Sequence, residues 1–231
     1  VHPASAYRFA PAVRPGRIRD YMTFEEHKKQ AMKRRGLEMP DLWYRMPTYT
    51  NRNTAALAAS GEEIAWPAYS DKLDAEFEIG LIVGRAGRDI EREHAWDHVA
   101  GFTIYNDLSA RDVQADERIC GSGPGKSKDF DQGNIIGPCI VTADAIDGRA
   151  IAMRFCVDGE EWARGSTSGM KHDWADLIVN ASRGESILPG DLIASGTMDG
   201  GCCVELGRWF ERGATIEMHA EGIGVLRNRI V

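Results

Sequence analysis

The sequence predicts an α+β fold that is mostly β, a mixed roll or barrel of short strands with a short N-terminal helix and a few peripheral helices. From residue 61 onward, short apolar runs of strand length alternate with turn signals. The turns carry glycine directly after Asp or Pro, as in Asp158-Gly159 and Pro189-Gly190. A compact barrel or roll of short strands requires such turns.

The chain divides into an N-terminal segment, residues 1–60, and a main domain, residues 61–231. We expect the first segment not to be an independent domain. It contains one predicted helix, at about residues 21–36, which Thr23 would cap and Gly36 would end, with acidic residues in its first turn and basic residues in its last. The stretch between this helix and residue 61 has too little pattern to assign beyond loop or short strand.

In the main domain, eight apolar runs are predicted to be strands: 63–67, 77–83, 101–105, 135–142, 151–157, 191–195, 214–219 and 223–230. Three helices are predicted between them, around residues 91–98, 109–117 and 174–182. No internal repeat is present. One body of short strands with helices at its edges is therefore expected.

Acidic residues occupy every second position at the start of one apolar segment, 73–84. On a strand, successive side chains alternate faces, so Asp74, Glu76 and Glu78 share one face. Carboxylates about 7 Å apart repel each other unless water screens them or a cation neutralises them. The apolar run that follows indicates a partly enclosed setting. A hard divalent cation at Glu76 and Glu78 is the simplest explanation.

A further carboxylate, Asp107, ends the strand that begins at Gly101. Taken alone, it is better explained as the N-cap of the helix that follows. Together with Glu76 and Glu78 it makes an incomplete shell of oxygen ligands, with positions left for water and a bidentate substrate, as a catalytic Mg²⁺ or Mn²⁺ requires. Ca²⁺ accepts the same ligands, so the sequence does not choose among the three ions.

Composition limits the partners and the location of the protein. A net charge of -7 and a pI near 5.4 argue against nucleic acid and anionic membranes as partners and favour a small molecule. No apolar stretch is long enough to span a membrane, and no signal peptide is recognisable. The five cysteines lack Cys-x-x-Cys spacing, which predicts a reducing, cytoplasmic location rather than a disulfide scaffold.

Three other groups of residues have ordinary structural explanations. His94 and His98 are four residues apart, but no glutamate completes a metal-binding helix motif. Cys202 and Cys203 lack an identifiable base, which argues against a cysteine nucleophile. The basic run between Lys28 and Arg35 is typical of a solvated helix face.

Four segments together resemble the fumarylacetoacetate hydrolase superfamily in their order and separation: Asp74 to Glu78, Gly101 to Gln114, Gly125 to Phe130 with Gly137-Pro138, and Leu188 to Thr197. The resemblance covers residues 61–231. It implies a mixed β-roll that is usually dimeric. It also implies a set of roles: Glu76, Glu78 and Asp107 as metal ligands, Lys128 as the active-site lysine, and Gln114 and Thr197 as substrate contacts.

Two of these assignments also have local support. Lys128 follows a glycine-rich stretch that lets the backbone approach a ligand. The resemblance favours it over Lys126, because Asp129-Phe130 follows it and its spacing to Gly137-Pro138 is that of the family. An ammonium beside the metal would stabilise an oxygen that gains negative charge as a bond breaks. Gly196 and Thr197, which follow an apolar strand, offer backbone N–H groups and a hydroxyl to a carboxylate, although an ordinary strand-end turn explains them as well.

His27 is the only histidine assigned to chemistry. The resemblance implies a general base on a mobile lid helix, partnered in many short members by an acid three residues later. That position is Gln30 in this chain, and glutamine can neither hold an imidazolium nor accept a proton. Glu25, Glu26 or an acid elsewhere could replace it. The water-activating step is therefore less firmly predicted than metal binding.

The function that follows is divalent-metal-dependent hydrolysis of a C–C bond in a small β-dicarbonyl or 2-oxo acid, of the acylpyruvate or fumarylpyruvate type, through an enolate held by the metal and Lys128. Decarboxylation, tautomerisation or dehydration of a 2-keto-3-deoxy acid would use the same enolate and stay as alternatives. A homologue that binds a metal or ligand without turnover is a more remote one.

Overall fold

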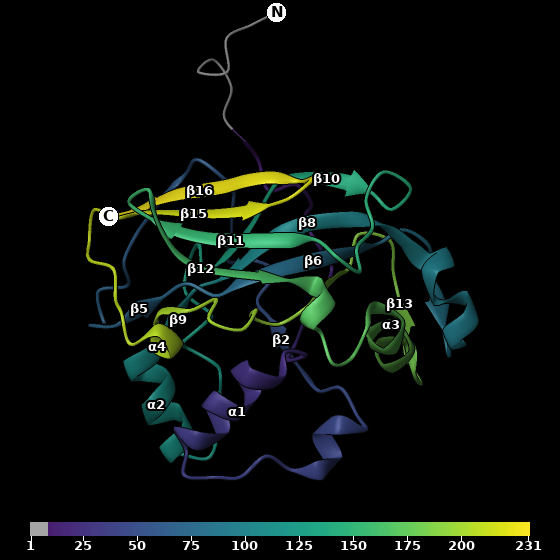
Figure 1. Ribbon diagram of the computed structural model, residues 1–231, viewed down its shortest axis with the longest axis horizontal. Coiled ribbons are helices and arrows are strands. Elements are labelled where there is room, and N and C mark those ends of the chain that lie inside the picture. The colour runs from purple at the N-terminus through teal and green to yellow at the C-terminus, as the bar shows by residue number, and fades with distance from the viewer. Residues whose placement is uncertain (1–8) are drawn as a thin grey trace, which may run out of the picture.

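Two mixed β-sheets form the body of the structure, a computed structural model that describes residues 9–231 (Figure 1). The larger sheet has seven strands in the order β2 (Tyr49–Arg52), β1 (Ile18–Tyr21), β14 (Leu192–Ala194), β6 (Phe77–Val83), β8 (Val99–Asp107), β10 (Asn134–Thr142) and β3 (Leu57–Ala58). The smaller has five, in the order β12 (Glu160–Ser166), β11 (Ala152–Val157), β15 (Thr215–Ala220), β16 (Gly224–Ile230) and β4 (Glu63–Ile64).

Short elements complete the fold. Two further strand pairs join β5 (Leu73–Asp74) to β9 (Ser109–Ala110) and β7 (Gly87–Arg88) to β13 (Ser186–Ile187). The α-helices are α1 (Glu25–Lys33), α2 (Arg111–Ile119), α3 (Trp174–Ser182) and α4 (Cys203–Leu206), and the 3-10 helices are Asp41–Tyr44, Arg92–His98 and Thr167–Gly169. None of the helices within residues 9–231 combines the length and apolarity needed to cross a membrane.

The main core lies between the two sheets. Phe102 on β8, Phe155 on β11 and Met218 on β15 belong to one buried apolar cluster. On β6, Phe77 and Ile79 point into this cluster, as the two-residue period of a strand requires. The predicted segregation of apolar and acidic faces along this segment is confirmed.

Helices α1, α2 and α4 gather at one end of the sheets, whereas α3 lies at the other side (Figure 1). Helix α3 spans the residues that the sequence predicted and begins with a capping box, in which Asp173 and Asp176 each accept from the other's backbone N–H. The segment around 91–98 is a 3-10 helix rather than an α-helix. Residues 109–110 form β9, so α2 begins later than predicted.

The N-terminal helix is shorter than predicted, and Thr23 does not cap it. The hydroxyl of Thr23 donates to the carbonyl of Ser195 at 2.6 Å, and its backbone N–H bonds the same carbonyl. The chain therefore stays extended beyond β1 and turns into the helix only at Glu25, while Gly36, at φ +67°, still marks its end. This anchor fixes where α1 leaves the sheet.

Three strands come from the first sixty residues and take part in the seven-stranded sheet. β1 pairs in parallel with β14 and antiparallel with β2. Residues 1–8 lie outside the described residues. The sequence did not predict β1, because its four residues include two charged side chains, Arg19 and Asp20, and both are buried.

Candidate active site

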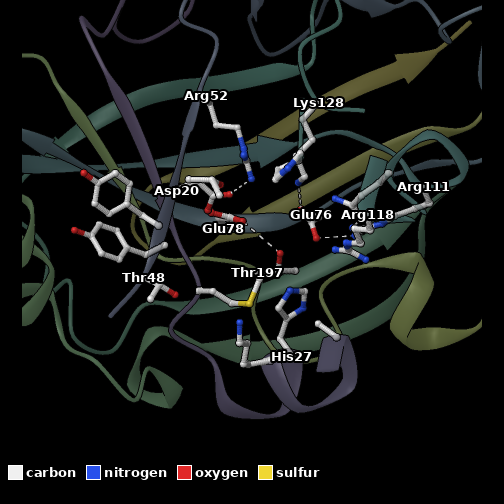
Figure 2. Close-up of a pocket in the computed structure, with 18 of the residues that line it drawn as sticks. Asp20, His27, Thr48, Arg52, Glu76, Glu78, Arg111, Arg118, Lys128 and Thr197 are labelled. Atoms are coloured by element: carbon white, nitrogen blue, oxygen red, sulfur yellow. Dashed lines mark hydrogen bonds and ion pairs between the residues drawn. The ribbon is translucent and has the colours of Figure 1, made fainter. Parts of the chain in front are cut away.

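A cavity of about 270 Å³ opens where β1, β2 and β6 meet helices α1 and α2. Charged and polar side chains dominate its lining, among them Asp20, Arg52, Glu76, Glu78, Arg111, Lys128, Thr197 and His27. In Figure 2 the acidic residues cross the middle of the view, with Arg52 and Lys128 on one side and His27, on its helix, on the other.

Three buried carboxylates converge from three strands of the large sheet. Oxygen atoms of Asp20 on β1, Glu78 on β6 and Asp107 on β8 all lie within 4.8 Å of one another. Glu78 and Asp107 were predicted from the sequence, whereas Asp20 was not. The strand order β1-β14-β6-β8 brings these side chains together.

Buried cations surround the carboxylates. Lys128 donates to Glu76 and Asp107, and Arg52 donates to Asp20 and, at 3.0 Å, to Asp107. Glu76 thus lies at the edge of the group and is held by cations rather than joined to the three oxygens above.

Arg111 holds a second carboxylate pair. It donates to Glu76 at 2.6 Å and to Asp74 at 2.7 Å. Asp74 would be expected at the solvent-side end of the acidic face, where no ligand role was assigned to it, but it is fully buried and also accepts from the backbone N–H of Cys203. The start of α4 closes over it and excludes water.

The surroundings shift the pKa values of these carboxylates in opposite directions. Burial, together with repulsion from Asp20, Asp107 and Glu76, raises the pKa of Glu78 well above its usual range. Burial also raises the pKa of Asp20 to about 6, against the attraction of Arg52. Burial opposes ionisation of Glu76 too, but Arg111 and Lys128 outweigh it and hold the pKa of Glu76 well below normal.

The residues present fit a hard divalent cation. The Oδ1 atoms of Asp20 and Asp107 are buried and have no hydrogen-bond partner among residues 9–231, an arrangement that costs free energy unless something binds them. All the atoms that converge as possible metal ligands are carboxylate oxygens, which suit Mg²⁺, Mn²⁺ or Ca²⁺. A dication would also offset the repulsion that raises the pKa of Glu78.

The other residues predicted for substrate binding reach the same cavity. Thr197 and Gln114 are buried and line it. The hydroxyl of Thr197 and the backbone N–H of Gly196 donate to Glu78 at 3.3 and 3.0 Å, so both position this carboxylate. The Gln114 amide oxygen accepts from Arg111 at 3.0 Å.

The two candidate lysines have different surroundings. Lys128 is 3% exposed and lies among the carboxylates, whereas the ammonium of Lys126 lies over the ring of Tyr69. Two residues of the basic run, Lys28 and Arg34, also line the cavity. Arg34 is exposed to solvent, and Lys28 is half-buried.

His27 lies on the side of α1 that faces the cavity, and its acidic partner comes from another element. Its Nδ1 lies 2.5 Å from Oε1 of Glu205 on α4, and both side chains are about 5% exposed. The two atoms are within ion-pair distance, but their alignment does not make a hydrogen bond. Gln30 is exposed. Asp199 accepts from the backbone N–H of His27 at 2.9 Å and fixes the start of the helix.

Sequence reasoning missed four residues of this site: Asp20, Arg52, Arg111 and Glu205. Arg111 lies inside a segment that carried the family resemblance, so a signal for it was present. Asp20 and Arg52 belong to short polar strands, and Glu205 follows a glycine-rich turn far from His27 in sequence. Only the tertiary fold brings these three to the cavity.

A family model described as the C-terminal domain of fumarylacetoacetate (FAA) hydrolase matches residues 17–231. The chain belongs to this family. The predicted family and fold are thereby confirmed, and the chain is an enzyme of a superfamily that includes hydrolases, isomerases and tautomerases.

Relatives of this fumarylacetoacetate hydrolase family member differ in reaction. The mitochondrial oxaloacetate tautomerase of Homo sapiens is 30% identical over 235 residues, covering 100% of the chain and 72% of the relative. A 5-carboxymethyl-2-hydroxymuconate delta-isomerase from Mycobacterium smegmatis superimposes with a TM-score of 0.81 at 28% identity, over 100% and 84% of the two chains. A fumarylpyruvate hydrolase from Pseudomonas aeruginosa, solved with Mn²⁺ and pyruvate, gives 0.78 at 26%, over 97% and 99%.

Proposed function

We propose that this protein hydrolyses a C–C bond in an acylpyruvate-type 2-oxo acid with the help of a divalent metal. The observation that carries the proposal is the buried pair of His27 and Glu205, on the opposite side of the cavity from the carboxylate cluster. A histidine supported by a carboxylate is a general base. Glu205 takes the place of the acid that is expected at position 30, where this chain has glutamine.

Asp20, Glu78 and Asp107 would hold the metal, with Glu76 beside them, and Mg²⁺ or Mn²⁺ suits this oxygen set. When bound, the ion would orient the oxygens of a 2-oxo acid and offset the negative charge that develops there. The Mn²⁺ and pyruvate in the Pseudomonas relative support this assignment. Gly196 and Thr197 keep Glu78 aimed at the cluster through their hydrogen bonds.

Each step of the reaction is then assigned to a group of the protein. His27 takes a proton from water through the ring nitrogen that does not face Glu205, and Glu205 stabilises the imidazolium. The hydroxide adds to the distal carbonyl carbon, the C–C bond breaks, and the electron pair of that bond goes to the pyruvate enolate. Lys128 lies beside Glu76 and Asp107 and is placed to stabilise the enolate oxygen. His27 then returns its proton to the carbon of the enolate, which gives pyruvate beside the new carboxylic acid.

The charge at the cavity mouth favours a substrate with a second carboxylate, as in fumarylpyruvate. Lys28 on α1, Arg34 directly after that helix, and Arg118 on α2 line the cavity. Within residues 9–231 none of them has an acidic partner within ion-pair distance. Burial and the neighbouring Arg35 and Arg118 lower the pKa of Lys28. An anionic substrate terminus would relieve this repulsion.

Tautomerisation of oxaloacetate is the second candidate, because the human relative that aligns with the whole chain is an oxaloacetate tautomerase. It needs the same enolate stabilisation but no attack by water. The two reactions therefore differ in what they require of His27 and Glu205. Hydrolysis needs a base that activates water, whereas tautomerisation only moves a proton within the substrate.

The deciding experiment follows fumarylpyruvate, acetylpyruvate and oxaloacetate by ultraviolet absorbance and assays the pyruvate released, with Mn²⁺ and with chelator. Hydrolysis predicts pyruvate from the first two, lost with chelator and reduced roughly 10²–10⁴-fold in His27→Ala. Glu205→Gln should lower kcat with a smaller change in KM. Conversion of oxaloacetate between its keto and enol forms without any pyruvate from the acylpyruvates would replace hydrolysis by tautomerisation.

A further inference from the structure

A second group of ligand atoms lies around His27, on the other side of the cavity from the carboxylate cluster. One ring nitrogen of His27, the thiol of Cys202 and a carboxylate oxygen of Glu205 are all within 4.8 Å of one another. Cys202 is fully buried, and its backbone bridges to Glu76. This group thus adjoins the proposed catalytic cavity but offers nitrogen, sulfur and oxygen rather than oxygen alone.

Two atoms of this group have only each other as partner within residues 9–231. His27 Nδ1 and Glu205 Oε1 are buried and lie 2.5 Å apart, without the alignment of a hydrogen bond. The backbone N–H of His27 bonds Asp199, and the other oxygen of Glu205 accepts from the backbone N–H of Gly200 at 2.7 Å. Two buried atoms that meet without a hydrogen bond, beside a buried sulfur, are arranged as a ligand site.

We propose that His27, Cys202 and Glu205 form a second metal site that takes a thiophilic divalent cation such as Zn²⁺ and thereby inhibits the enzyme. The inhibition rests on the proposed function, because the bound ion would occupy the His27–Glu205 pair, whereas binding itself does not depend on it. Nitrogen, thiolate and carboxylate ligands are those that Zn²⁺ prefers, while Mg²⁺ and Mn²⁺ favour the all-oxygen cluster.

The geometry needs only a small adjustment. Zinc bonds of about 2.0 Å to nitrogen or oxygen and about 2.3 Å to sulfur place tetrahedral ligand atoms roughly 3.3–3.6 Å apart. The His27 and Glu205 atoms, now 2.5 Å apart, would therefore separate by about one ångström. As the sulfur–zinc bond forms, the thiol proton leaves to water, and the fourth position stays open for water.

Cys202 has a base nearby, contrary to the sequence expectation, yet it is not a nucleophile. Burial, with Asp74 next in effect, raises the pKa of the Cys202 thiol well above its usual range, so the metal-free thiol is neutral and unreactive. Cys203 is equally buried but does not belong to the group. It provides a matched control.

The test uses the full chain with excess Mn²⁺ in the oxygen cluster, then adds Co²⁺ as a spectroscopic substitute for zinc. We expect a near-ultraviolet thiolate-to-cobalt band in the wild type and in Cys203→Ser, and its loss in Cys202→Ser. Calorimetry with Zn²⁺ under the same conditions should show affinity weakened in Cys202→Ser by at least the roughly 10- to 100-fold that loss of an outer-shell partner costs. Cys202→Ala repeats the test should the serine variant fold poorly.

Absence of the band at saturating Co²⁺, or a band of unchanged intensity in both Cys202 variants, would overturn the site. Binding of Co²⁺ to the carboxylates alone would give no thiolate band and would also overturn it. Inhibition of turnover by Zn²⁺ is scored separately. If the band depends on Cys202 but bound Zn²⁺ leaves turnover unchanged, the metal site stands, while its inhibitory effect and the role of His27 as base both fall.

Discussion

Arg111 compensates two buried carboxylates at once, because it donates to Asp74 and Glu76 from a side chain that is 10% exposed. Arg111→Met would leave Asp74 without a cation and Glu76 with Lys128 alone. Breaking a buried pair by removing one partner typically costs about 3–5 kcal/mol, so we expect a loss of unfolding free energy of this size in urea denaturation.

The control for this prediction is Arg92→Met. Arg92 also bridges two carboxylates, Asp173 and Asp176, but its side chain is 55% exposed. Exposed pairs contribute about 0–1 kcal/mol. Equal losses in the two variants would show that burial of the Arg111 network is not what makes it stabilising.

Arg118 is predicted to select the second carboxylate of the substrate. Arg118→Gln should raise KM for fumarylpyruvate about five- to tenfold, equivalent to roughly 1–1.4 kcal/mol for a partly exposed pair, and leave KM for acetylpyruvate nearly unchanged. Steady-state kinetics on the two substrates measure this. Arg85→Gln removes the same charge outside the cavity and should alter neither value, and a parallel rise for both substrates in Arg118→Gln would refute the selective role.

Protons and metal compete for Asp20. Because the pKa of Asp20 is raised to about 6, the metal-free carboxyl is mostly protonated below that pH, and binding a cation must then displace the proton. We expect Mn²⁺ affinity to fall as pH drops through this value, measured by the Mn²⁺-induced rise in Tm one unit above and one unit below it. Asp20→Asn should lose most of the rise at both, whereas Asp97→Asn, on an exposed residue, should keep it.

At the scale of the elements, Gly196 controls how closely β14 and its following turn approach β1. Its φ is +81°, and a Cβ there would lie 2.5 Å from the carbonyl oxygen of Tyr21. Gly196→Ala should therefore displace the end of β1, destabilise the protein by more than about 1 kcal/mol, and weaken Mn²⁺ binding through Asp20. Thermal unfolding and Mn²⁺ titration measure the two effects.

Gly200 provides the comparison, since its φ is +71° but a Cβ there would meet nothing closer than 3.8 Å. Gly200→Ala carries the strain of a positive φ without the backbone clash. It should cost stability while leaving Mn²⁺ affinity near the wild-type value. A similar loss of affinity in both variants would mean that strain in the turn, rather than the approach to β1, controls the metal cluster.

The elements also explain how far sequence could predict the fold. β6 was predictable because it is a continuous apolar run, buried on both faces, and β16 because its buried residues recur at every second position. β1 and β2 were not, because Arg19, Asp20 and Arg52 are polar residues that only their partners make tolerable in the interior. Propensity and periodicity do not carry that information.

Over the whole molecule, thiol reactivity reports on the packing. Cys120 and Cys139 are exposed, and the other three cysteines are buried and free. Ellman's reagent should label two thiols in the native protein and all five after denaturation. Cys120→Ser and Cys139→Ser should each remove one native thiol from the count. Rapid labelling of a third that persists in Cys156→Ser would show that the region around α4 opens, because Cys156 lies on β11.

Only those site residues that lie together in short sequence segments were predictable. Glu76, Glu78, Asp107 and Lys128 lie in segments whose spacing carries information, and the fold brings them to the cavity. Glu205 meets His27 because α4 packs beside α1, which depends on the complete sheet. A partner that could lie anywhere in the chain has no signature in a single sequence.

The parallel pairing of β1 with β14 has a consequence for folding. It joins segments such as Arg17 and Asp191 that are 174 positions apart, and contacts of such high sequence separation form late because a long loop must close first. Asp20 and His27 can meet Glu78 and Glu205 only after that closure. A chain still emerging from the ribosome, or one truncated before α4, would therefore have no partly active form.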